Sequence, residues 1–346
     1  MTPPRQGAPA WLAEAGERIL NGERLSRDDL LALAEAGREN PHNLLGPANT
    51  VRTSVFGNAV RFCSIAPGKL GSCSEDCRWC AQSALCADQA EKPRYTPAAE
   101  ILAAASQAAD LGSASFGIVN SGRRPAKGDL EGVIRSAAEI SSAVGAGPAG
   151  RLRLCASLGE LTDAQAGRLA QAGITRYNHN LETSRGFYPI VVTSHTYDDR
   201  LATLAAVRRA GLSLCCGGIF GLGETWTDRV DLALTLRDEV HPDVVPLNFL
   251  HPMPGTPMAG MSSLPPIEIL CIIALFRLAL PHADIKIAGG REKNLRDLQS
   301  WMFYAGATSC LLGNYLTTAG RPPGEDIQMF ADLGLRVVKD LPTAGK

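Results

Sequence analysis

The chain has 346 residues, of which 20% are charged, and a formal net charge of -1. Acidic and basic side chains are interspersed, so the composition excludes a strongly basic face for nucleic acid or anionic lipid. The apolar stretch at 267–280 is interrupted by Glu268 and Arg277, and no segment resembles a signal peptide. We therefore expect a cytoplasmic protein that does not span a membrane. Its ten cysteines should stay reduced there, which favours metal ligation over disulfide bonds.

Residues 1–50 begin with a Pro-rich, mobile segment and continue as helices, with apolar positions near Ile19 and Leu30. Ser26 to Asp29 has the pattern of a capping box, which starts a helix. We expect a helical extension over 1–50, a single domain over 51–335 and a tail over 336–346.

From Val60 onward, short apolar runs alternate with helical patterns. The runs cover 60–66, 115–120, 152–158, 176–181, 213–220, 244–250, 284–288 and 308–312. Eight such units in tandem, with no internal break, predict an α/β fold of the (β/α)8 TIM barrel type. Further capping boxes at Thr162, Thr196 and Thr225 stand where helices should begin. An open, doubly wound sheet is the alternative fold.

Three cysteines fall within eight residues on a Gly-rich loop after the first run: Cys73, Cys77 and Cys80. Iron–sulfur clusters are held by thiolates in short runs of this kind. Three thiolates would hold a 4Fe–4S cluster by three of its irons and leave the fourth iron open to a small molecule. A structural zinc site is the alternative, but it needs four N or S ligands, and no fourth ligand lies near this loop.

Polar residues follow several predicted strands, at the barrel end where active sites form. Asn178, Asn180 and Glu182 share one face because side chains alternate along a strand. Glycines at 217, 218, 221 and 223 would let the backbone approach a ligand closely. Asn248 lies near the end of the sixth run and Lys286 lies in the seventh.

Each of these residues also has a simpler explanation. Asparagines at strand ends often form Asx turns, and buried cysteines usually act as small apolar side chains. We nevertheless expect Cys63, Cys155 and Cys215, from three different strands, to line one cavity together with the cysteine loop. Such convergence is not expected of unrelated packing residues.

The cysteine loop has the spacing C-x-x-x-C-x-aromatic-C, with Trp79 as the aromatic residue, and resembles the radical S-adenosylmethionine (SAM) superfamily. Within it, residues 44–335 resemble the biotin synthase family. The most specific stretches are 68–83, 177–183, 217–224, 246–248, 254–257, 289–292 and 313–318.

The resemblance implies that Cys73, Cys77 and Cys80 hold the 4Fe–4S cluster at which SAM binds. Other residues are implied to bind SAM: Trp79, Asn180, Glu182, Arg200 and the backbone around Ile219. Asn178 and Asn248 match positions that bind dethiobiotin, and an amide suits an uncharged urea because it offers both a donor and an acceptor.

A second, auxiliary iron–sulfur cluster is also implied, with a departure from the usual pattern. Well-known members bind a two-iron (2Fe–2S) cluster with three cysteines and one arginine, but two of these positions read Gly117 and Lys286 here. Another branch carries a cysteine on the first strand, matched by Cys63, and is associated with a four-iron cluster bearing an extra sulfide. We expect that arrangement, with Cys63, Cys155 and Cys215 as ligands, beside Lys286.

The implied activity is that of a sulfurtransferase that inserts sulfur into dethiobiotin. A 5'-deoxyadenosyl radical made from SAM would remove hydrogens from C9 and C6, and the auxiliary cluster would supply the sulfur. The implied partners are an electron donor such as flavodoxin or ferredoxin and a second copy of the chain in a homodimer. The rival functions are a sister radical enzyme, such as a methylornithine synthase or a hydrogenase-maturation protein, and a non-enzymatic iron–sulfur carrier.

Overall fold

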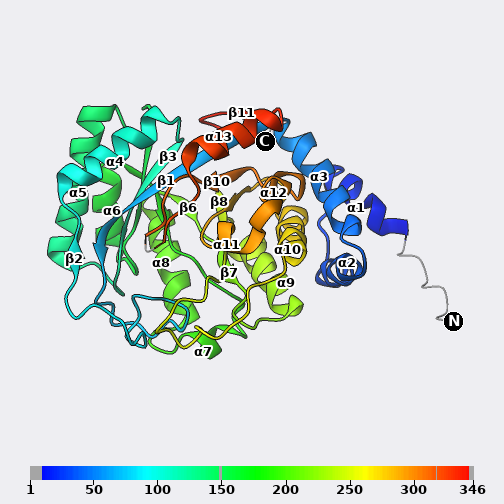
Figure 1. Ribbon diagram of the computed structural model, residues 1–346, viewed down its shortest axis with the longest axis horizontal. Coiled ribbons are helices and arrows are strands. Elements are labelled where there is room, and N and C mark those ends of the chain that lie inside the picture. Colours follow the sequence, from blue (N-terminus) through cyan, green and yellow to red (C-terminus); the bar gives the residue numbers. More distant parts are fainter. Residues whose placement is uncertain (1–9, 148–149, 317, 343–346) are drawn as a thin grey trace.

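A computed structural model describes residues 10–147, 150–316 and 318–342 and shows a closed barrel of parallel strands surrounded by helices (Figure 1). The Pro-rich start, the last four residues of the expected tail and Thr317 of the 313–318 stretch lie outside the described residues. The pairing of β10 with β1 closes the barrel, so the TIM-barrel prediction is confirmed and the open sheet is wrong.

The ring of the barrel has eight strand positions, which we call staves and which follow one another in chain order. The fifth stave consists of two short strands. The staves are β1 (Ala59–Leu70), β3 (Ser115–Asn120), β4 (Arg153–Ser157), β5 (Ile174–Asn178), β6 with β7 (Ser213–Cys215 and Gly218–Phe220), β8 (Val244–Phe249), β9 (Asp284–Ile287) and β10 (Ser309–Leu311). Each overlaps one of the predicted runs. Two short strands pair with β1 outside this ring: β2 (Arg94–Tyr95) and β11 (Arg336–Val337).

The fifth stave is interrupted at Cys216 and Gly217, which the sequence prediction treated as continuous strand. Pro246 of β8 lies opposite, and proline has no N–H to donate to the ladder. A side chain at Gly217 would collide with the backbone of Pro246. The chain therefore passes Pro246 closely at this point and resumes pairing at Gly218.

Helices cover the outside of the barrel and one flank of it. They are α1 (Ala10–Leu20), α2 (Arg27–Glu39), α3 (His42–Phe56), α4 (Ala98–Asp110), α5 (Lys127–Val144), α6 (Asp163–Gln171), α7 (Tyr188–Val191), α8 (Tyr197–Arg209), α9 (Trp226–Thr235), the π-helical turn η1 (Leu236–Val240), α10 (Pro266–Ala279), α11 (Arg291–Leu295), the 3-10 turn η2 (Arg296–Leu298), α12 (Trp301–Tyr304) and α13 (Pro323–Asp332).

The four predicted capping boxes all form. The side chains of Ser26, Thr162, Thr196 and Thr225 each accept a hydrogen bond from the backbone N–H three residues later. Each satisfies one of the N–H groups that a helix start leaves without a partner, so these helix starts were readable from the sequence.

The helical extension packs on the barrel at α10 (Figure 1). Its third helix, α3, runs past residue 50 to Phe56 and leads directly into β1. Arg27 of α2 also pairs with Asp231 of α9, with Nε and Oδ1 at 2.7 Å. Buried side chains of α2, α3 and α10 belong to the same apolar core, for example Leu33, Val51 and Ile273.

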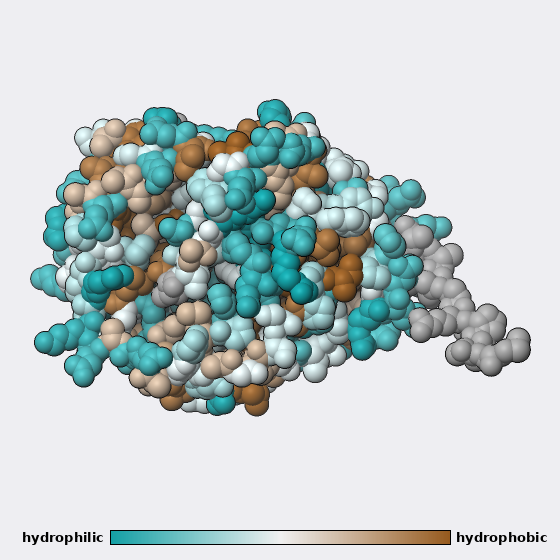
Figure 2. Space-filling view, viewed as in Figure 1, coloured by the Kyte–Doolittle hydropathy of each residue, from teal (hydrophilic) through white to brown (hydrophobic). Residues whose placement is uncertain are grey.

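The main apolar core lies between the strands and the surrounding helices. The cavities inside the barrel have mixed linings, in which polar side chains such as Asn178 and Lys286 stand among apolar ones such as Ile219 and Phe249. On the face seen in Figure 2, hydrophilic and hydrophobic residues are interspersed. In the part of the chain that the structure describes, no helix is both long and apolar enough to cross a bilayer.

Candidate active site

The cysteine loop lies at the carboxyl end of β1 and is fixed by hydrogen bonds to the segment before α8. The Asp76 carboxylate accepts from the backbone N–H groups of Thr193 and Ser194, both at 3.0 Å. The Ser194 hydroxyl donates to Glu75 at 2.7 Å. These acidic residues between Cys73 and Cys77 hold the loop against the barrel, and the sequence prediction gave them no role.

The three loop cysteines are partly buried free thiols. Burial raises the pKa of Cys77, and burial raises the pKa of Cys80 to about 11, with negative charge on the neighbouring cysteines adding to both effects. A metal centre would therefore have to displace protons when it binds. Three thiols on one loop beside an open cavity fit an iron–sulfur cluster with one exchangeable iron.

No group of three or more His, Cys, Asp or Glu side chains among the described residues is gathered tightly enough to ligate a single metal ion. Four ligands bound to one zinc ion must all lie within about 2.3 Å of it. An iron–sulfur cluster distributes its cysteines over several irons, so they need not converge on one point.

An upper cavity of about 360 Å³ opens beside this loop, within the carboxyl end of the barrel. Most of the residues expected to bind cofactor or substrate line it. They are Cys63, Trp79, Cys80, Cys155, Asn178, Asn180, Glu182, Cys215, Ile219, Asn248 and Lys286. The structure therefore brings together side chains from six staves and the cysteine loop.

Arg200 of α8 does not line the upper cavity but supports residues that do. Its guanidinium donates to the Asn180 carbonyl at 2.7 Å and to the Tyr188 hydroxyl at 2.6 Å, and it lies 3.6 Å from the Glu182 carboxylate. Burial raises the pKa of Glu182, and the charge of Arg200 opposes that rise. Arg200 thus holds a carboxylate in place at the cavity wall.

The carboxyl end of β5 presents its polar groups in the predicted alternation, although the strand itself ends at Asn178. Asn180 accepts a hydrogen bond from the Gly217 N–H at 3.2 Å. Glu182 has a φ of 71°, a left-handed conformation that is rare outside glycine. Its backbone pairs with Gly218, where a side chain would collide with the Glu182 carbonyl.

Two asparagines at the cavity wall are held by fixed hydrogen bonds rather than by Asx turns. The Asn178 amide donates to the Cys215 sulfur at 3.2 Å. The Asn248 amide donates to the Gly218 carbonyl at 3.1 Å and accepts from the Gly289 N–H at 2.9 Å. Both amides therefore have set orientations toward whatever occupies the cavity.

Cys63, Cys155 and Cys215 lie deeper in the lumen and are buried. The Lys286 ammonium reaches both Cys215 and Cys63, with N–S distances of 3.5 and 3.8 Å. Burial opposes the charge of Lys286, but the three sulfurs raise its pKa. Burial raises the pKa of Cys155 to about 11. These three thiols around one cation fit a second iron–sulfur cluster.

Other cysteines stay outside this group. Cys216 follows Cys215 but points away into the apolar core, as do Cys271 and Cys310. Gly117 lies beside Cys155 on the neighbouring strand, and a side chain there would come within 3.3 Å of Ile65. Keeping position 117 small leaves the space beside Cys155 open.

Two residues in contact with this group were missed by the sequence prediction. The Ser115 hydroxyl donates to the Cys63 sulfur at 3.2 Å, and Arg176 lies directly across from Cys155 in the strand pairing. Strand alternation was the available signal, because Arg176 and Asn178 are two residues apart and share a face.

Two family models match consecutive parts of the barrel. The sequence profile of the radical SAM superfamily matches residues 70–236, and that of the Biotin and Thiamin Synthesis associated domain matches residues 246–336. The chain is 45% identical to the biotin synthase of Trichlorobacter lovleyi over 324 residues, covering 93% of this chain and 95% of that protein. It is 46% identical to the biotin synthase of Geobacter sulfurreducens over 321 residues, covering 92% and 95%.

Solved structures with the same fold are far less similar in sequence. A methylornithine synthase superposes with a TM-score of 0.79 at 18% identity, covering 94% of this chain and 97% of that one. The FeFe-hydrogenase maturase of Carboxydothermus hydrogenoformans superposes with a TM-score of 0.73 at 18% identity, covering 94% and 79%. These two likenesses establish the shared barrel alone.

Proposed function

Because the chain belongs to the biotin synthase family of radical SAM enzymes, we propose that the upper cavity is where SAM and dethiobiotin meet above an auxiliary iron–sulfur cluster. Members of this family are sulfurtransferases that use SAM and a 4Fe–4S cluster and act on dethiobiotin. The rival functions, a sister radical enzyme and an iron–sulfur carrier, are therefore set aside.

One observation carries the proposal: one cysteine of the loop and three cysteines of the strands line a single cavity, whereas Cys73 and Cys77 lie outside its lining. Cys80 marks the upper group, and Cys63, Cys155 and Cys215 form the lower group. An enzyme that only cleaved SAM would need the upper group alone. A site that also transfers sulfur needs a second sulfur-bearing centre within reach of the same substrate.

In this proposal Cys73, Cys77 and Cys80 hold the 4Fe–4S cluster. Trp79, Asn180, Glu182 and Ile219 line the cavity and would bind SAM. The Glu182 carboxylate suits ribose hydroxyl groups, as acidic residues do in dinucleotide sites. Arg200 acts as a positioning residue because it touches Glu182 and Asn180 but not the cavity.

Asn178 and Asn248 would bind the urea of dethiobiotin. Their hydrogen bonds to Cys215, Gly218 and Gly289 keep the amides from rotating, so the substrate would meet preset donors and acceptors. When bound, the clusters supply the electron that cleaves SAM and the sulfur that enters the product. The chain supplies orientation and exclusion of water.

For the auxiliary centre we propose a four-iron cluster with an extra sulfide rather than a two-iron cluster. Support comes from Cys63 in the group, from the open space at Gly117, and from Lys286, whose ammonium can donate to sulfur but is a poor ligand for iron. Iron and acid-labile sulfide quantification with Mössbauer spectroscopy tests this, and a two-iron spectrum would overturn it.

The proposal also includes a flavodoxin or ferredoxin as electron donor, a homodimer and a cytoplasmic location. The electron donor is tested by replacing dithionite with each protein reductant in the assay. The homodimer is tested by light scattering of the reconstituted protein, and the cytoplasmic location by fractionation of cells that express the protein.

The two groups of thiols are separated experimentally by single substitutions. Cys77→Ala should abolish deoxyadenosine release from SAM, because one of three cluster ligands is lost. Cys155→Ala should abolish biotin formation but retain deoxyadenosine release. Cys271→Ala, a buried cysteine of α10 outside the cavity, is the matched control and should retain both. Equal loss of both products in Cys77→Ala and Cys155→Ala would contradict separate roles.

A further inference from the structure

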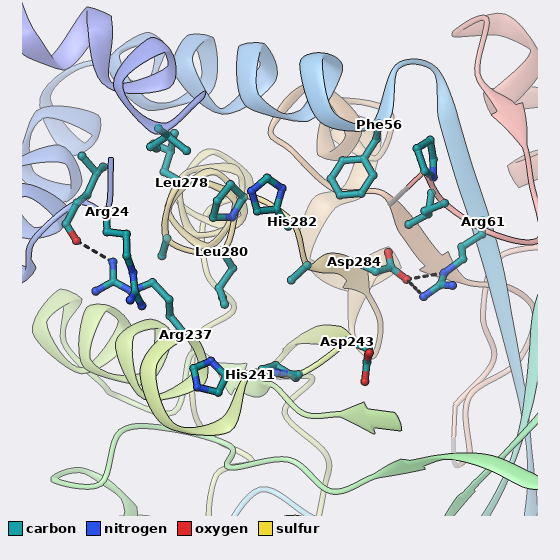
Figure 3. Close-up of a pocket in the computed structure, with 18 of the residues that line it drawn as sticks. Arg24, Phe56, Arg61, Arg237, His241, Asp243, Leu278, Leu280, His282 and Asp284 are labelled. Atoms are coloured by element: carbon teal, nitrogen blue, oxygen red, sulfur yellow. Dashed lines mark hydrogen bonds and ion pairs between the residues drawn. The ribbon is translucent and has the colours of Figure 1, made fainter. Parts of the chain in front are cut away.

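A second, larger cavity of about 840 Å³ lies at the opposite end of the barrel, and we call it the lower cavity. The amino ends of the inner strands, the helical extension and the C-terminal segment enclose it. In Figure 3, Arg61 and Asp284 form an ion pair on the barrel side, whereas Arg24 and Arg237 stand on the side of the extension.

The lower and upper cavities share one lining residue, Arg176 of β5. Its side chain lies across from Cys155, so it stands beside the proposed auxiliary cluster. Arg176 is 8% exposed, and its Nε donates to the Ser213 hydroxyl at 3.0 Å. Among the described residues it forms no ion pair, whereas two neighbouring arginines do.

Those two neighbours are neutralised by carboxylates. Arg61 donates to Asp284 at 2.6 Å, and Arg153 pairs with Asp340 of the C-terminal segment. TIM-barrel lumens are normally filled by branched aliphatic side chains, so a cluster of arginines here is unusual. The Cys155 and Cys215 thiols and the Asp284 carboxylate act on the charge of Arg176, but none of them pairs with it directly. Its guanidinium is therefore open to a small anion beside these thiols.

This inference rests on the proposed function, because that function requires a small sulfur anion. Each product molecule would carry away one sulfur atom of the auxiliary cluster, so that atom must be replaced before the next turnover. SAM and dethiobiotin would fill the upper cavity, whereas the lower cavity reaches the cluster site from the other side.

We propose that the lower cavity admits hydrosulfide, a small sulfur anion, and that Arg176 binds it beside Cys155 on its way to the auxiliary cluster. Binding and passage neither form nor break a bond. The C-terminal segment would close the opening, because β11 pairs with β1 and Asp340 pairs with Arg153. Asp340 is largely exposed to solvent, so this closure is weak and reversible.

The test uses the full-length reconstituted enzyme after a single turnover, with the reductant then removed. Hydrosulfide labelled with a heavy sulfur isotope is added, and the isotope in acid-labile sulfide is followed by mass spectrometry. We expect the uptake rate to be the same when SAM and dethiobiotin are added back. If they block uptake, the anion enters through the upper cavity and the inference is wrong.

Substitutions at the lower cavity should change the uptake rate in opposite directions. Ala283→Trp fills the cavity in front of β9 and should slow uptake about tenfold, whereas Asp340→Ala should speed it several-fold by freeing Arg153 and loosening the closure. Ala210→Trp is the matched control: it is also a partly buried alanine before an inner strand, but it does not line the cavity. Its uptake rate should not change.

Arg176 itself is tested by a conservative pair. Arg176→Gln should slow uptake about tenfold, and Arg176→Lys should retain most of the rate, since it keeps the positive charge. Spectra of the auxiliary cluster are recorded before turnover and identify any variant in which the cluster itself is altered. For such a variant, the uptake rate of Ala283→Trp is compared with that of the wild type instead.

Failure of this inference can be told apart from failure of the proposed function. If the first turnover delivers no cluster sulfur to the product, the proposed function is wrong. If the first turnover is normal but Ala283→Trp and Asp340→Ala both take up label at the wild-type rate, only the lower-cavity inference is overturned. Should Ala283→Trp fail to fold, the Asp340→Ala rate decides.

Discussion

At the scale of single residues, Asn178 connects the substrate position to a cluster ligand. Its amide donates to the Cys215 sulfur and also lines the upper cavity. Hydrogen bonds to the sulfurs of an iron–sulfur cluster are one of the factors that set its reduction potential. Asn248 lines the same cavity but donates to the Gly218 carbonyl instead.

We therefore predict that Asn178→Ala and Asn248→Ala both weaken dethiobiotin binding, but that only Asn178→Ala makes the reduction potential of the auxiliary cluster more negative. The reason is the loss of a donor to Cys215. Redox titration followed by electron paramagnetic resonance measures the potential. The same potential in both variants would show that Asn178 does not act on the cluster.

A second residue-scale prediction concerns His179, which is buried and whose Nε2 has no hydrogen-bond partner among the described residues. Burial lowers the pKa of His179 well below the usual 6.5. The unfolded chain then binds a proton near pH 6.5 that the native chain does not bind. The contribution to stability is complete above that pH and is lost as the pH falls below it.

His179→Leu should therefore make the melting temperature less sensitive to pH between about 7.5 and 5. Differential scanning calorimetry of wild type and variant across this range measures the slope. An unchanged slope would mean that His179 binds its proton equally well in the native and the unfolded state.

The residues that line the site were largely predictable from the sequence. The side chains that contact and position those residues were not. Cys63, Cys155 and Cys215 were expected to line one cavity from three different strands, and all three do. Arg200 was expected in the cavity but lies behind it, because a helix after a strand can direct a long side chain either way. Ser115 and Arg176 were missed because alternation gives only the face of a strand on which a side chain lies, and not which group that side chain contacts.

At the scale of elements, two glycines give opposite predictions. A methyl group at Gly217 would collide with the Pro246 carbonyl at the break between β6 and β7, so Gly217→Ala should lower the free energy of unfolding by about 1–3 kcal/mol. Gly167 lies inside α6 with nothing within 4 Å of an added methyl group, so Gly167→Ala should raise it by about 0.5–1 kcal/mol. Urea denaturation measures both, and a stabilising Gly217→Ala would contradict the close approach.

The capping box of α6 gives a third element-scale prediction. Thr162→Ala should lower the free energy of unfolding by about 1 kcal/mol, because the Gln165 N–H loses its partner. Thr162→Ser keeps the hydroxyl and is the control. Urea denaturation compares the two, and an equal loss would assign the effect to the threonine methyl group.

Element order and type were read correctly because each stave is a short apolar run bounded by turn residues. The interruption at Cys216 was missed, since it depends on Pro246 of the next stave rather than on local sequence. The pairing of β11 with β1 was missed for a similar reason: two exposed residues more than 270 positions away carry no signal of their own.

At the scale of the whole molecule, the helical extension and the barrel share one apolar core through α2, α3 and α10. We predict that α2 and α10 open in the same unfolding event, since separating them would expose Leu33, Val51 and Ile273 together. Amide hydrogen exchange at increasing denaturant measures the opening of each helix. Earlier exchange of α2 would show that the extension unfolds on its own.

The lower cavity belongs to this scale as well. It forms only where the extension, the strand ends and the C-terminal segment meet, so no single stretch of sequence predicts it. What the sequence did contain was Arg61 and Arg153, each two residues before a cysteine of the lower group. Their common inward direction follows from alternation, but their shared cavity follows only from closure of the ring.

The position of the main apolar core, between the strands and the helices, has a consequence for how such a catalyst can diversify. Structural integrity resides outside the ring of strands, so inward-facing positions can gain or lose sulfur, amide and ammonium groups at modest thermodynamic cost. A lineage could thus exchange one inorganic centre for another, moving a cysteine from one stave to the next, while the scaffold around it stays intact.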